Sequence, residues 1–597
     1  MDKNTIWAIA LSTLVIVVFM FLQTTVFAPQ QPLPTEVTEN TAKLDTATYI
    51  SESTTAANQP AFIVTSDIEE TIDEQTITIT TDKVKAVFTN RGGDIISYEL
   101  LEHIDTDTGN GVEMVDNVTA FNRACAVSFG DANSTIVDEL FSVEQPDENT
   151  VLFTRRFDTF TFGKRYTFIP GEYLFKLEIL VHSDAEAIAL NTDGAAYTLR
   201  TSPQIGPRFD PKRNRYEMRQ FISFNGEKKK TINVGTKQFK SYEREYIWAG
   251  IAGKYFEELV VPENTTNMTS EPYYSSQVEK GDYANAQAFF VRKPFFGTDM
   301  SDTYYLYFGP RNEKDLRSYN TSENNGWNLS NIRLTESMQT SGWLGWLENI
   351  LKVILELLYK VVHNWGVAII VMTILLKLAM FPLTKKQSMG TLKMQALQPR
   401  MTEIQERYKD NPQKMQMEMS KLYKENNYNP MSGCLPMVFQ FLIIFAMYNL
   451  FNNYFEFRGA SFIPGWISDL SAGDSVYTFK KDIPIISTFL GNAIRILPVI
   501  YLASQLFYGK ITMVGGTATG SNAGQMKFMM YGMPLMFFFI FYNAPSGLLL
   551  YWTVSNLIQM GQQLIINKFM AQRKTELATQ QDEKFVKNNK KRLARSK

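Results

Sequence analysis

The sequence predicts a multi-domain membrane protein, in which a large antiparallel β-sandwich is joined to a core of five transmembrane helices. Three observations lead to this fold class. An apolar run lies close to the N-terminus, a period-two pattern covers residues 61–335, and five apolar runs alternate with basic segments over residues 361–567. A chain of 597 residues is also too long for one compact core.

The first apolar run covers residues 6–22, and a polar segment follows at residues 29–60. The run is either a cleaved signal peptide, with a weak cleavage site at 26–28, or an uncleaved transmembrane anchor. We favour an anchor over residues 1–28, because the run is longer than a usual signal core. Both interpretations export the residues that follow. Residues 29–60 are rich in Pro, Gln, Thr, Ser and Glu, which predicts a flexible linker.

Residues 61–335 show the alternation that is typical of half-buried β-strands. The segment at 76–80 reads TITIT, and the segment at 173–181 reads YLFKLEILV, with apolar side chains on one face. Turn signals such as NRGGD at 90–94 separate these runs. Frequent turns between period-two runs predict an antiparallel sandwich.

Residues 341–360 change to a helical period directly before the first span of the core. One face carries charged residues four positions apart, which are Glu348, Lys352, Glu356 and Lys360. Another face carries large apolar residues, which are Trp343, Trp346, Leu347, Ile350, Ile354 and Leu358. Tryptophans on an amphipathic helix beside a span predict a helix in the membrane interface. An ordinary helix packed on the sandwich is the alternative.

The apolar runs of the core cover residues 364–383, 434–451, 494–508, 528–542 and 546–566. The run at 528–542 is short for a span, but NAPSG at 543–547 predicts a tight turn and hence a hairpin across thin membrane. Segment 385–425 holds nine basic and five acidic residues, and the tail at 568–597 holds ten and three. Positive segments stay in the cytoplasm, so six spans place the N-terminus inside, and the sandwich and the loop at 452–491 outside.

The segment at 385–429 is too long and too patterned for a simple connector. Two helical stretches are separated near DNPQ at 410–413, which predicts a helical hairpin that projects into the cytoplasm. Its methionines are Met389, Met394, Met401, Met415, Met417 and Met419. Methionine adapts to varied apolar surfaces, so these residues either contact partners or simply pack the two helices together.

Lys377 is the charged residue in the apolar stretch VMTILLKLAM at 371–380. A charge near the middle of a bilayer costs roughly 2.5–3.5 kcal/mol on insertion scales. The ammonium either reaches the cytoplasmic interface, pairs with an acid in the bundle, or lines a water-filled cavity. The other C-terminal spans contain no Asp or Glu, which argues against the ion pair.

Polar residues in the predicted spans favour a hydrophilic cavity that opens to the cytoplasm. Thr373 lies one helical turn before Lys377, on the same face. The other polar residues of the spans are Gln440, Asn449, Gln505, Asn556, Gln559 and Gln563, of which the last three share one helical face. We expect Lys377, Thr373, Gln440, Asn556 and Gln559 to line the cavity.

The sequence contains no motif for catalysis, a metal or a cofactor. Its two cysteines, Cys125 and Cys434, fall in different halves of the chain, which argues against a disulfide. Its three histidines, His103, His182 and His363, are scattered without metal-ligand spacing. There is no phosphate-binding glycine loop and no nucleophile elbow. We expect no catalytic residue and no cofactor.

Several segments follow one another with a distinctive order and spacing. In the membrane half they are MFPLTKKQ (380–387), LQPRM (397–401), LYKENNYNPMSGCLPMVFQF (422–441), WISDLSAGD (466–474) and APSGLLLYWTVSNLIQMGQQ (544–563). Weaker ones in the outer half are FTNRGGDI (88–95), WAGIAGKYF (248–256) and LYFGP (306–310). Together they resemble the YidC family of membrane protein insertases, in the form found in Gram-negative bacteria.

This resemblance implies an insertase rather than an enzyme. The family helps nascent membrane proteins to enter the bilayer and fold, alone or beside the Sec translocon, without nucleotide or covalent intermediate. The resemblance implies a multi-pass protein of the bacterial inner membrane, with a cytoplasmic N-terminus. It also implies a periplasmic β-supersandwich, whose relatives bind sugars, although no residue here assigns sugar binding. A hydrated groove would open to the cytoplasm and to lipid and stay closed outside.

The resemblance also implies roles for individual residues. The groove charge of the family falls on Lys377, and Thr373 lies in the same groove. Many members carry arginine at the first position; lysine keeps the charge but lacks the bidentate fork. Tyr551 and Trp552 fall in the region that contacts passing substrate helices, and Trp552 is often tyrosine in relatives. The hairpin and the basic tail would meet ribosomes or targeting factors, unless the tail only fixes orientation.

Two other function classes compete with an insertase. A small-solute transporter or channel would also need polar spans and a membrane lysine, but the chain lacks a second membrane acid and internal repeats. The outer domain could instead be a glycan-binding domain or a glycan-modifying enzyme. Whether two carboxylates face each other in a cleft of that domain cannot be judged without the fold.

Overall fold

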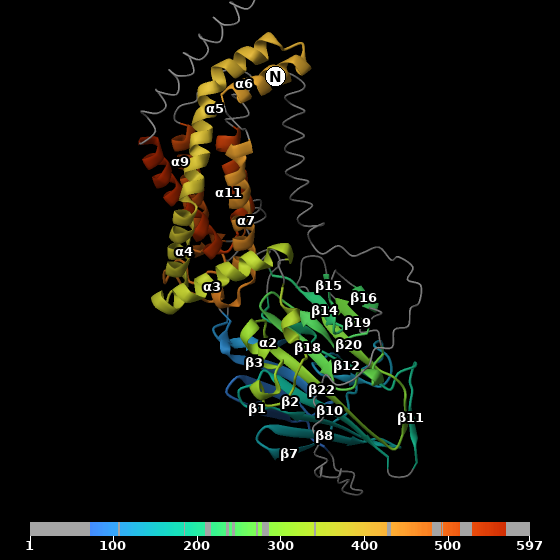
Figure 1. Cartoon of the computed structure of the whole chain (residues 1–597). Helices are drawn as coiled ribbons and strands as arrows, with labels where there is room; N and C mark the ends of the chain where they lie inside the picture. The colour runs from blue at the N-terminus through green and yellow to red at the C-terminus, as the bar shows by residue number, and fades with distance from the viewer. Residues whose placement is uncertain are drawn as a thin grey trace, which may run out of the picture.

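The computed structural model divides into a β-rich part and a helix-rich part, with one helix lying across the boundary between them (Figure 1). It describes residues 72–105, 108–183, 186–208, 217–233, 238–241, 245–269, 273–276, 286–339, 342–426, 431–479, 491, 493–513 and 528–568. We call residues 72–339 the β-domain and residues 342–568 the helical domain. The predicted anchor, the predicted linker and nearly all of the basic tail lie outside the described residues.

Three sheets build the β-domain, and their strand pairs are antiparallel. The nine-stranded sheet has the order β15 (Lys229–Asn233), β14 (Gln220–Phe224), β17 (Trp248–Ala252), β18 (Phe256–Pro262), β22 (Asp299–Pro310), β10 (Leu174–His182), β9 (Thr161–Thr167), β8 (Thr150–Arg156) and β7 (Ser142–Asp147). The five-stranded sheet has the order β16 (Gln238–Ser241), β19 (Tyr273–Ser276), β20 (Gln287–Arg292), β12 (Tyr197–Arg200) and β6 (Val127–Ser128). The four-stranded sheet has the order β1 (Thr76–Thr80), β2 (Val84–Thr89), β3 (Asp94–Ile104) and β4 (Gly111–Glu113). The predicted antiparallel β-sandwich is confirmed.

Smaller elements complete the β-domain. The two-stranded sheets pair β5 (Val115–Asp116) with β13 (Gln204–Ile205), and β11 (Ile188–Leu190) with β21 (Phe295–Gly297). The short helices are η1 (Thr265–Asn267), α2 (Glu313–Ser318), η2 (Ser322–Asn324) and η3 (Leu334–Ser337). Helix α2 faces the helical domain, so it helps to form the boundary between the two parts.

The alternation in the sequence explains the core of the β-domain. In β10, Phe175, Leu177, Ile179 and Val181 are buried, as the period-two pattern predicts. Strands β17 and β18 differ, because all of their residues are buried on both faces. One large hydrophobic cluster joins the side chains of all three sheets, and a smaller one consists of Ala132, Ala195, Phe289 and Val291.

The helical domain follows the order of the predicted apolar runs. Its helices are η4 (Gly342–Leu344), α3 (Gly345–Val362), α4 (Trp365–Ala379), α5 (Phe381–Arg407), α6 (Pro412–Glu425), α7 (Met431–Asn453), η5 (Phe455–Phe457), α9 (Leu497–Met513), η6 (Phe528–Gly532), α11 (Met533–Phe541) and a last helix at 546–568. A short sheet pairs β23 (Tyr477–Thr478) with β24 (Ala493–Ile494). Helices α5 and α6 occupy the range of the predicted hairpin and extend from the end of the bundle that lies away from the β-domain (Figure 1). That they face the cytoplasm stays a prediction.

Helices α4 and α5 meet at a bend of 54° beside Pro382. Judged by length and composition, none of the helices in the described residues would cross a membrane as a single helix, whereas α4 together with residues 381–388 would do so as a bent pair.

Helix α3 has two apolar faces, where the sequence analysis expected one. Leu351 and Leu355 are buried against the helical domain, and Leu347, Ile354 and Leu358 pack beside them. The outward face exposes large apolar side chains, which are Trp343, Trp346, Ile350, Val353, Leu357 and Val361. The single apolar face that the sequence predicts therefore combines residues of the buried face with residues of the exposed face. A helical period of 3.6 residues shows where apolar residues line up, but it does not show which of them pack against another element.

Phe455 connects the two domains. Its ring centroid lies 5.3 Å from that of His103, 6.1 Å from that of Tyr255 and 5.8 Å from that of Phe256, all of which belong to the β-domain. The guanidinium of Arg458 lies 4.8 Å from the ring centroid of Phe256. The loop after α7 is thus anchored in the β-domain by aromatic contacts.

Candidate functional site

Lys377 lies in the last turn of α4 and is buried between helices. Asn364 precedes helix α4, and its side chain accepts a hydrogen bond from Val367 N and so caps the first turn. A cation in the last turn is favoured by the helix dipole, because the free carbonyl groups carry partial negative charge. The position of Lys377 within its own helix therefore offsets part of the cost of burying its charge.

The Lys377 ammonium is held by two amide side chains from other helices. Its Nζ lies 3.1 Å from Gln559 Oε1 and 3.4 Å from Gln440 Oε1. Gln559 belongs to the last helix and Gln440 belongs to α7. Both amides present their oxygen to the ammonium, which is the only orientation that satisfies a donor without acceptor capacity.

A wider polar network surrounds this contact. Gln559 Nε2 donates to the Tyr508 hydroxyl at 2.9 Å, and Gln562 Nε2 donates to the carbonyl of Lys377 at 3.0 Å. One turn further along, Ser388 Oγ donates to Gln563 Oε1 at 3.2 Å. The last helix thus joins α4, α5 and α9 through the amide groups of one face. We call Lys377, Gln440, Tyr508, Gln559 and Gln562 the polar cluster.

The structure brings together some of the residues that the sequence singled out. Gln440 and Gln559 contact Lys377, whereas Asn556 donates to Ser504 Oγ at 3.0 Å, one turn away from the cluster. Thr373 is buried and donates to the carbonyl of Ile369 within its own helix, at 2.6 Å. Its hydroxyl is therefore used locally, as is usual for threonine inside a membrane helix.

Sequence reasoning missed Tyr508 and Gln562. Tyr508 is the last residue of the apolar run at 494–508, so only its hydroxyl could have suggested a polar role. Gln562 stands beside Gln563 in a Gln-Gln pair, and the pattern did not reveal which of the two faces inward. Its Oε1 is buried and has no hydrogen-bond partner among the described residues.

Tyr551 and Trp552 lie within the packed core of the helical domain. Tyr551 is buried against Phe451, with ring centroids 6.2 Å apart. Trp552 packs edge-on against Phe541, at 4.7 Å between centroids, and also contacts Tyr501. The indole Nε1 of Trp552 is buried without a described hydrogen-bond partner. Both rings thus hold the last helix against its neighbours in this state.

Asp474 holds the start of α9 by hydrogen bonds. Its carboxylate accepts hydrogen bonds from Trp466 Nε1 at 3.0 Å and from the backbone amides of Ile496 and Leu497 at 2.8 and 2.9 Å. Arg495 Nη1 donates to the Asp474 carbonyl at 2.8 Å. The segment WISDLSAGD thereby supplies the first free amides of α9 with an acceptor, which gives that motif a physical role.

The site offers a buried positive charge without a built-in counterion. The described side chains that accept a hydrogen bond from Lys377 are amides, and no group of three or more His, Cys, Asp or Glu residues among the described residues could hold a metal ion. An ammonium whose partners are neutral can attract a carboxylate from another molecule, because amide contacts leave its charge uncompensated. The polar cluster therefore contains a buried ammonium whose described hydrogen-bond acceptors are neutral.

The comparisons with known proteins agree with a membrane insertase. Residues 76–356 match the model of the YidC periplasmic domain, and residues 357–574 match that of the 60Kd inner membrane protein. The membrane protein insertase YidC of Treponema denticola is 42% identical over 96% of this chain and 100% of its own length. That of Treponema pallidum is 37% identical over the same shares. A crystal structure of an active YidC insertase matches 82% of this chain and 93% of its own, at 19% identity and a TM-score of 0.33.

The family models and the relatives define a membrane protein insertase with a periplasmic domain. With this identity over nearly the full length of its relatives, the chain belongs to the YidC family of inner-membrane insertases that carry a periplasmic domain.

Proposed function

We propose that this protein inserts nascent membrane proteins into the inner membrane through a hydrophilic groove that contains Lys377. One observation carries the proposal: a lysine is buried among apolar helices and held by Gln440 and Gln559, with no acidic partner among the described residues. A charge that costs free energy to bury and has no structural counterion is more useful for binding a substrate than for stabilising a bundle.

The mechanism follows from the cost of moving polar segments through hydrocarbon. Peptide groups and acidic side chains lose their water partners there, at several kcal/mol for each group, roughly. A hydrophilic groove shortens the distance that these groups travel through hydrocarbon. We propose that it is lined by Lys377, Thr373, Gln440, Asn556 and Gln559. Lys377 attracts acidic outer segments as a point charge, and the short hairpin at 528–566 thins the bilayer.

The apolar part of the substrate then leaves between the helices into lipid. Tyr551 and Trp552 contact it on the last helix once the helices separate, since both side chains are buried in the structure. The cytoplasmic hairpin at 385–429 and the basic tail meet ribosomes, and the protein works alone or beside the Sec translocon. The N-terminus lies in the cytoplasm and the β-domain in the periplasm.

Rescue of insertion in cells that are depleted of the native protein tests this proposal. The cells receive wild type, Lys377→Arg or Lys377→Met, together with a series of small membrane proteins graded in acidic residues. We expect Arg to rescue and Met to slow insertion of the acidic substrates by about tenfold, which corresponds to the loss of roughly 1.4 kcal/mol. Equal rescue by all three, or a Met effect that is flat across the series, would refute charge attraction.

A further inference from the structure

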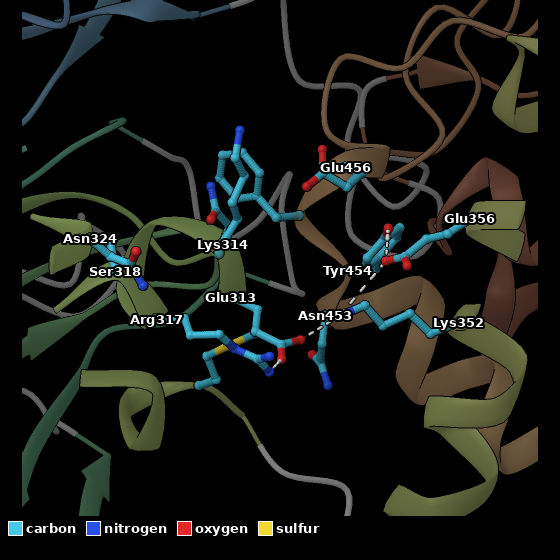
Figure 2. Close-up of a pocket in the computed structure, with 13 residues that line it drawn as sticks. Glu313, Lys314, Arg317, Ser318, Asn324, Lys352, Glu356, Asn453, Tyr454 and Glu456 are labelled. Carbon is cyan, nitrogen blue, oxygen red and sulfur yellow. Dashed lines mark hydrogen bonds and ion pairs between the residues drawn. The ribbon is translucent and has the colours of Figure 1, made fainter. Parts of the chain in front are cut away.

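A cavity of about 490 Å³ lies at the boundary between the two domains (Figure 2). Helix α2 of the β-domain forms one wall, and α3 and the end of α7 form the others. Lys352 of α3 lies 2.6 Å from Glu313 of α2, and this ion pair spans the cavity from one domain to the other. A cavity of this size has the volume of a small-ligand site.

Six charged side chains line the cavity, and most of them neutralise one another. They are Glu313, Lys314, Arg317, Lys352, Glu356 and Glu456. Glu313 pairs with both Arg317 and Lys352, and the Tyr454 hydroxyl donates to Glu356 at 2.8 Å. The three acids and three bases leave the lining without net charge, so a neutral or zwitterionic ligand disturbs the balance least.

Two of these charges have no direct contact partner in the described part of the chain, although Lys314 attracts Glu456 at longer range. The Lys314 ammonium and the Glu456 carboxylate make no hydrogen bond or ion pair there, and Figure 2 shows them on facing sides of the cavity. Partial burial, together with the negative charges of Asp315 and Glu356, raises the pKa of Glu456, whereas the positive charges of Lys352 and Lys314 oppose this shift. A cation bound beside Glu456 would stabilise its ionised carboxylate, and an anion would pair with the ammonium of Lys314.

The cavity lies next to the exposed apolar stripe of α3. Lys352 and Glu356 face the cavity, and Val353 and Leu357 are the next residues along the helix and are exposed. Successive residues are about 100° apart around a helix, so the cavity opens beside the stripe. If the stripe with Trp343 and Trp346 enters the bilayer, the cavity lies at the depth of the lipid headgroups.

We propose that this cavity binds the headgroup of a zwitterionic phospholipid with a primary ammonium, that is, phosphatidylethanolamine. Its phosphate lies beside Lys314 and its ammonium beside Glu456 and Glu356. A primary ammonium donates three hydrogen bonds to these carboxylates, whereas the quaternary ammonium of phosphatidylcholine donates none. The bound lipid fills the boundary between α2 and α3, and the inference does not depend on the proposed insertion mechanism.

Native mass spectrometry of the full-length protein, in detergent micelles with equal amounts of phosphatidylethanolamine, phosphatidylcholine and phosphatidylglycerol, tests the proposal. We expect wild type to retain phosphatidylethanolamine about fivefold over each other lipid, as one or two added hydrogen bonds would give. Lys314→Gln and Glu456→Gln should abolish this preference. Lys360→Gln on α3 and Glu323→Gln near α2 should keep it, because both side chains are exposed outside the cavity.

Three results would overturn the proposal. The first is equal retention of the three lipids by wild type. The second is a preference that survives in both cavity variants. The third is competition by glycerophosphoethanolamine at the same concentration as the lipid, which would assign the cavity to a soluble zwitterion instead. Because Lys314 and Glu456 are exposed side chains, neither variant should disturb folding, and matching thermal unfolding of the variants and wild type checks this.

Discussion

Gln559 Oε1 accepts a hydrogen bond from Lys377 Nζ at 3.1 Å across 182 residues of sequence. The same amide donates through Nε2 to the Tyr508 hydroxyl at 2.9 Å. Gln559 therefore has a fixed orientation: its oxygen faces the ammonium because its nitrogen is held by Tyr508. Through this hydrogen bond, Tyr508 can act on the ammonium by orienting Gln559.

Tyr508→Phe should weaken insertion of acidic substrates, because it removes the hydroxyl that holds the Gln559 amide. The variant frees Gln559 to turn its nitrogen toward the ammonium, and one hydrogen bond is worth about 1 kcal/mol, so we expect a loss of about fivefold. The insertion rate of the acidic substrate series measures it. Tyr531→Phe, in the exposed part of η6, should have no effect.

A double variant distinguishes this orienting role from general damage. If Tyr508 acts through Gln559, Tyr508→Phe adds nothing to Gln559→Leu, because the leucine has no amide to orient. Additive losses would show that the two residues act separately, and this would contradict the proposed chain of contacts.

Part of the polar cluster could be predicted from the sequence because one residue, Lys377, is charged and lies within an apolar run. A lysine within an apolar run has few explanations, and the amides at positions 440 and 559 stood in other apolar runs. Pattern alone could not show which amides meet, since Gln440 and Asn556 look equivalent along the chain. Helix rotation and packing decide that Gln440 contacts Lys377 and Asn556 contacts Ser504.

In the β-domain, too, the sequence pattern predicts the elements but not which distant residues meet. Period two predicted the strands at 76–80 and 173–181, which the structure has as β1 and as most of β10. In β18, Glu257 and Glu258 are both buried, which a half-buried pattern does not anticipate. Their partners come from distant segments: Ser337 Oγ donates to Glu257 at 2.7 Å, and Ser202 N donates to Glu258 at 3.1 Å. Only the fold supplies such contacts.

Acid should weaken the contact between the two domains through His103. The imidazole lies against Phe455, and burial together with the nearby Arg458 lowers its pKa to about 4. Glu102 and Asp315 oppose this shift, and Lys83 adds to it. A histidine with a lowered pKa contributes stability above its unfolded pKa of about 6.5, and that stability is lost as the pH falls through 4.

Thermal unfolding of wild type and His103→Gln between pH 7 and 4 measures this effect. The glutamine does not titrate, so the advantage of wild type over the variant should shrink by about 2 kcal/mol across this range, after allowance for partial exposure of the imidazole. Parallel pH profiles of the two proteins would show that the pKa of His103 is the same in the folded and the unfolded state, and this would contradict the prediction.

Gly366→Ala should destabilise the helical domain, because Phe462 occupies the space that a side chain would need. A Cβ at position 366 would lie 2.2 Å from Cδ2 and 2.5 Å from Cβ of Phe462, so a rotation of the ring alone does not relieve the contact. Overpacking of this kind costs about 1–3 kcal/mol, and thermal unfolding of the full chain in detergent measures it.

The clash and the helix preference of alanine can be separated by two further variants. Gly561→Ala, in the last helix, meets no atom within 4 Å and should stabilise by up to about 1 kcal/mol, since alanine favours a helix. Gly366→Ala combined with Phe462→Ala should cost less than the sum of the single changes, because the smaller side chain admits the new methyl group. Strict additivity would mean that Gly366 is required for the backbone of α4 rather than for the close approach of Phe462.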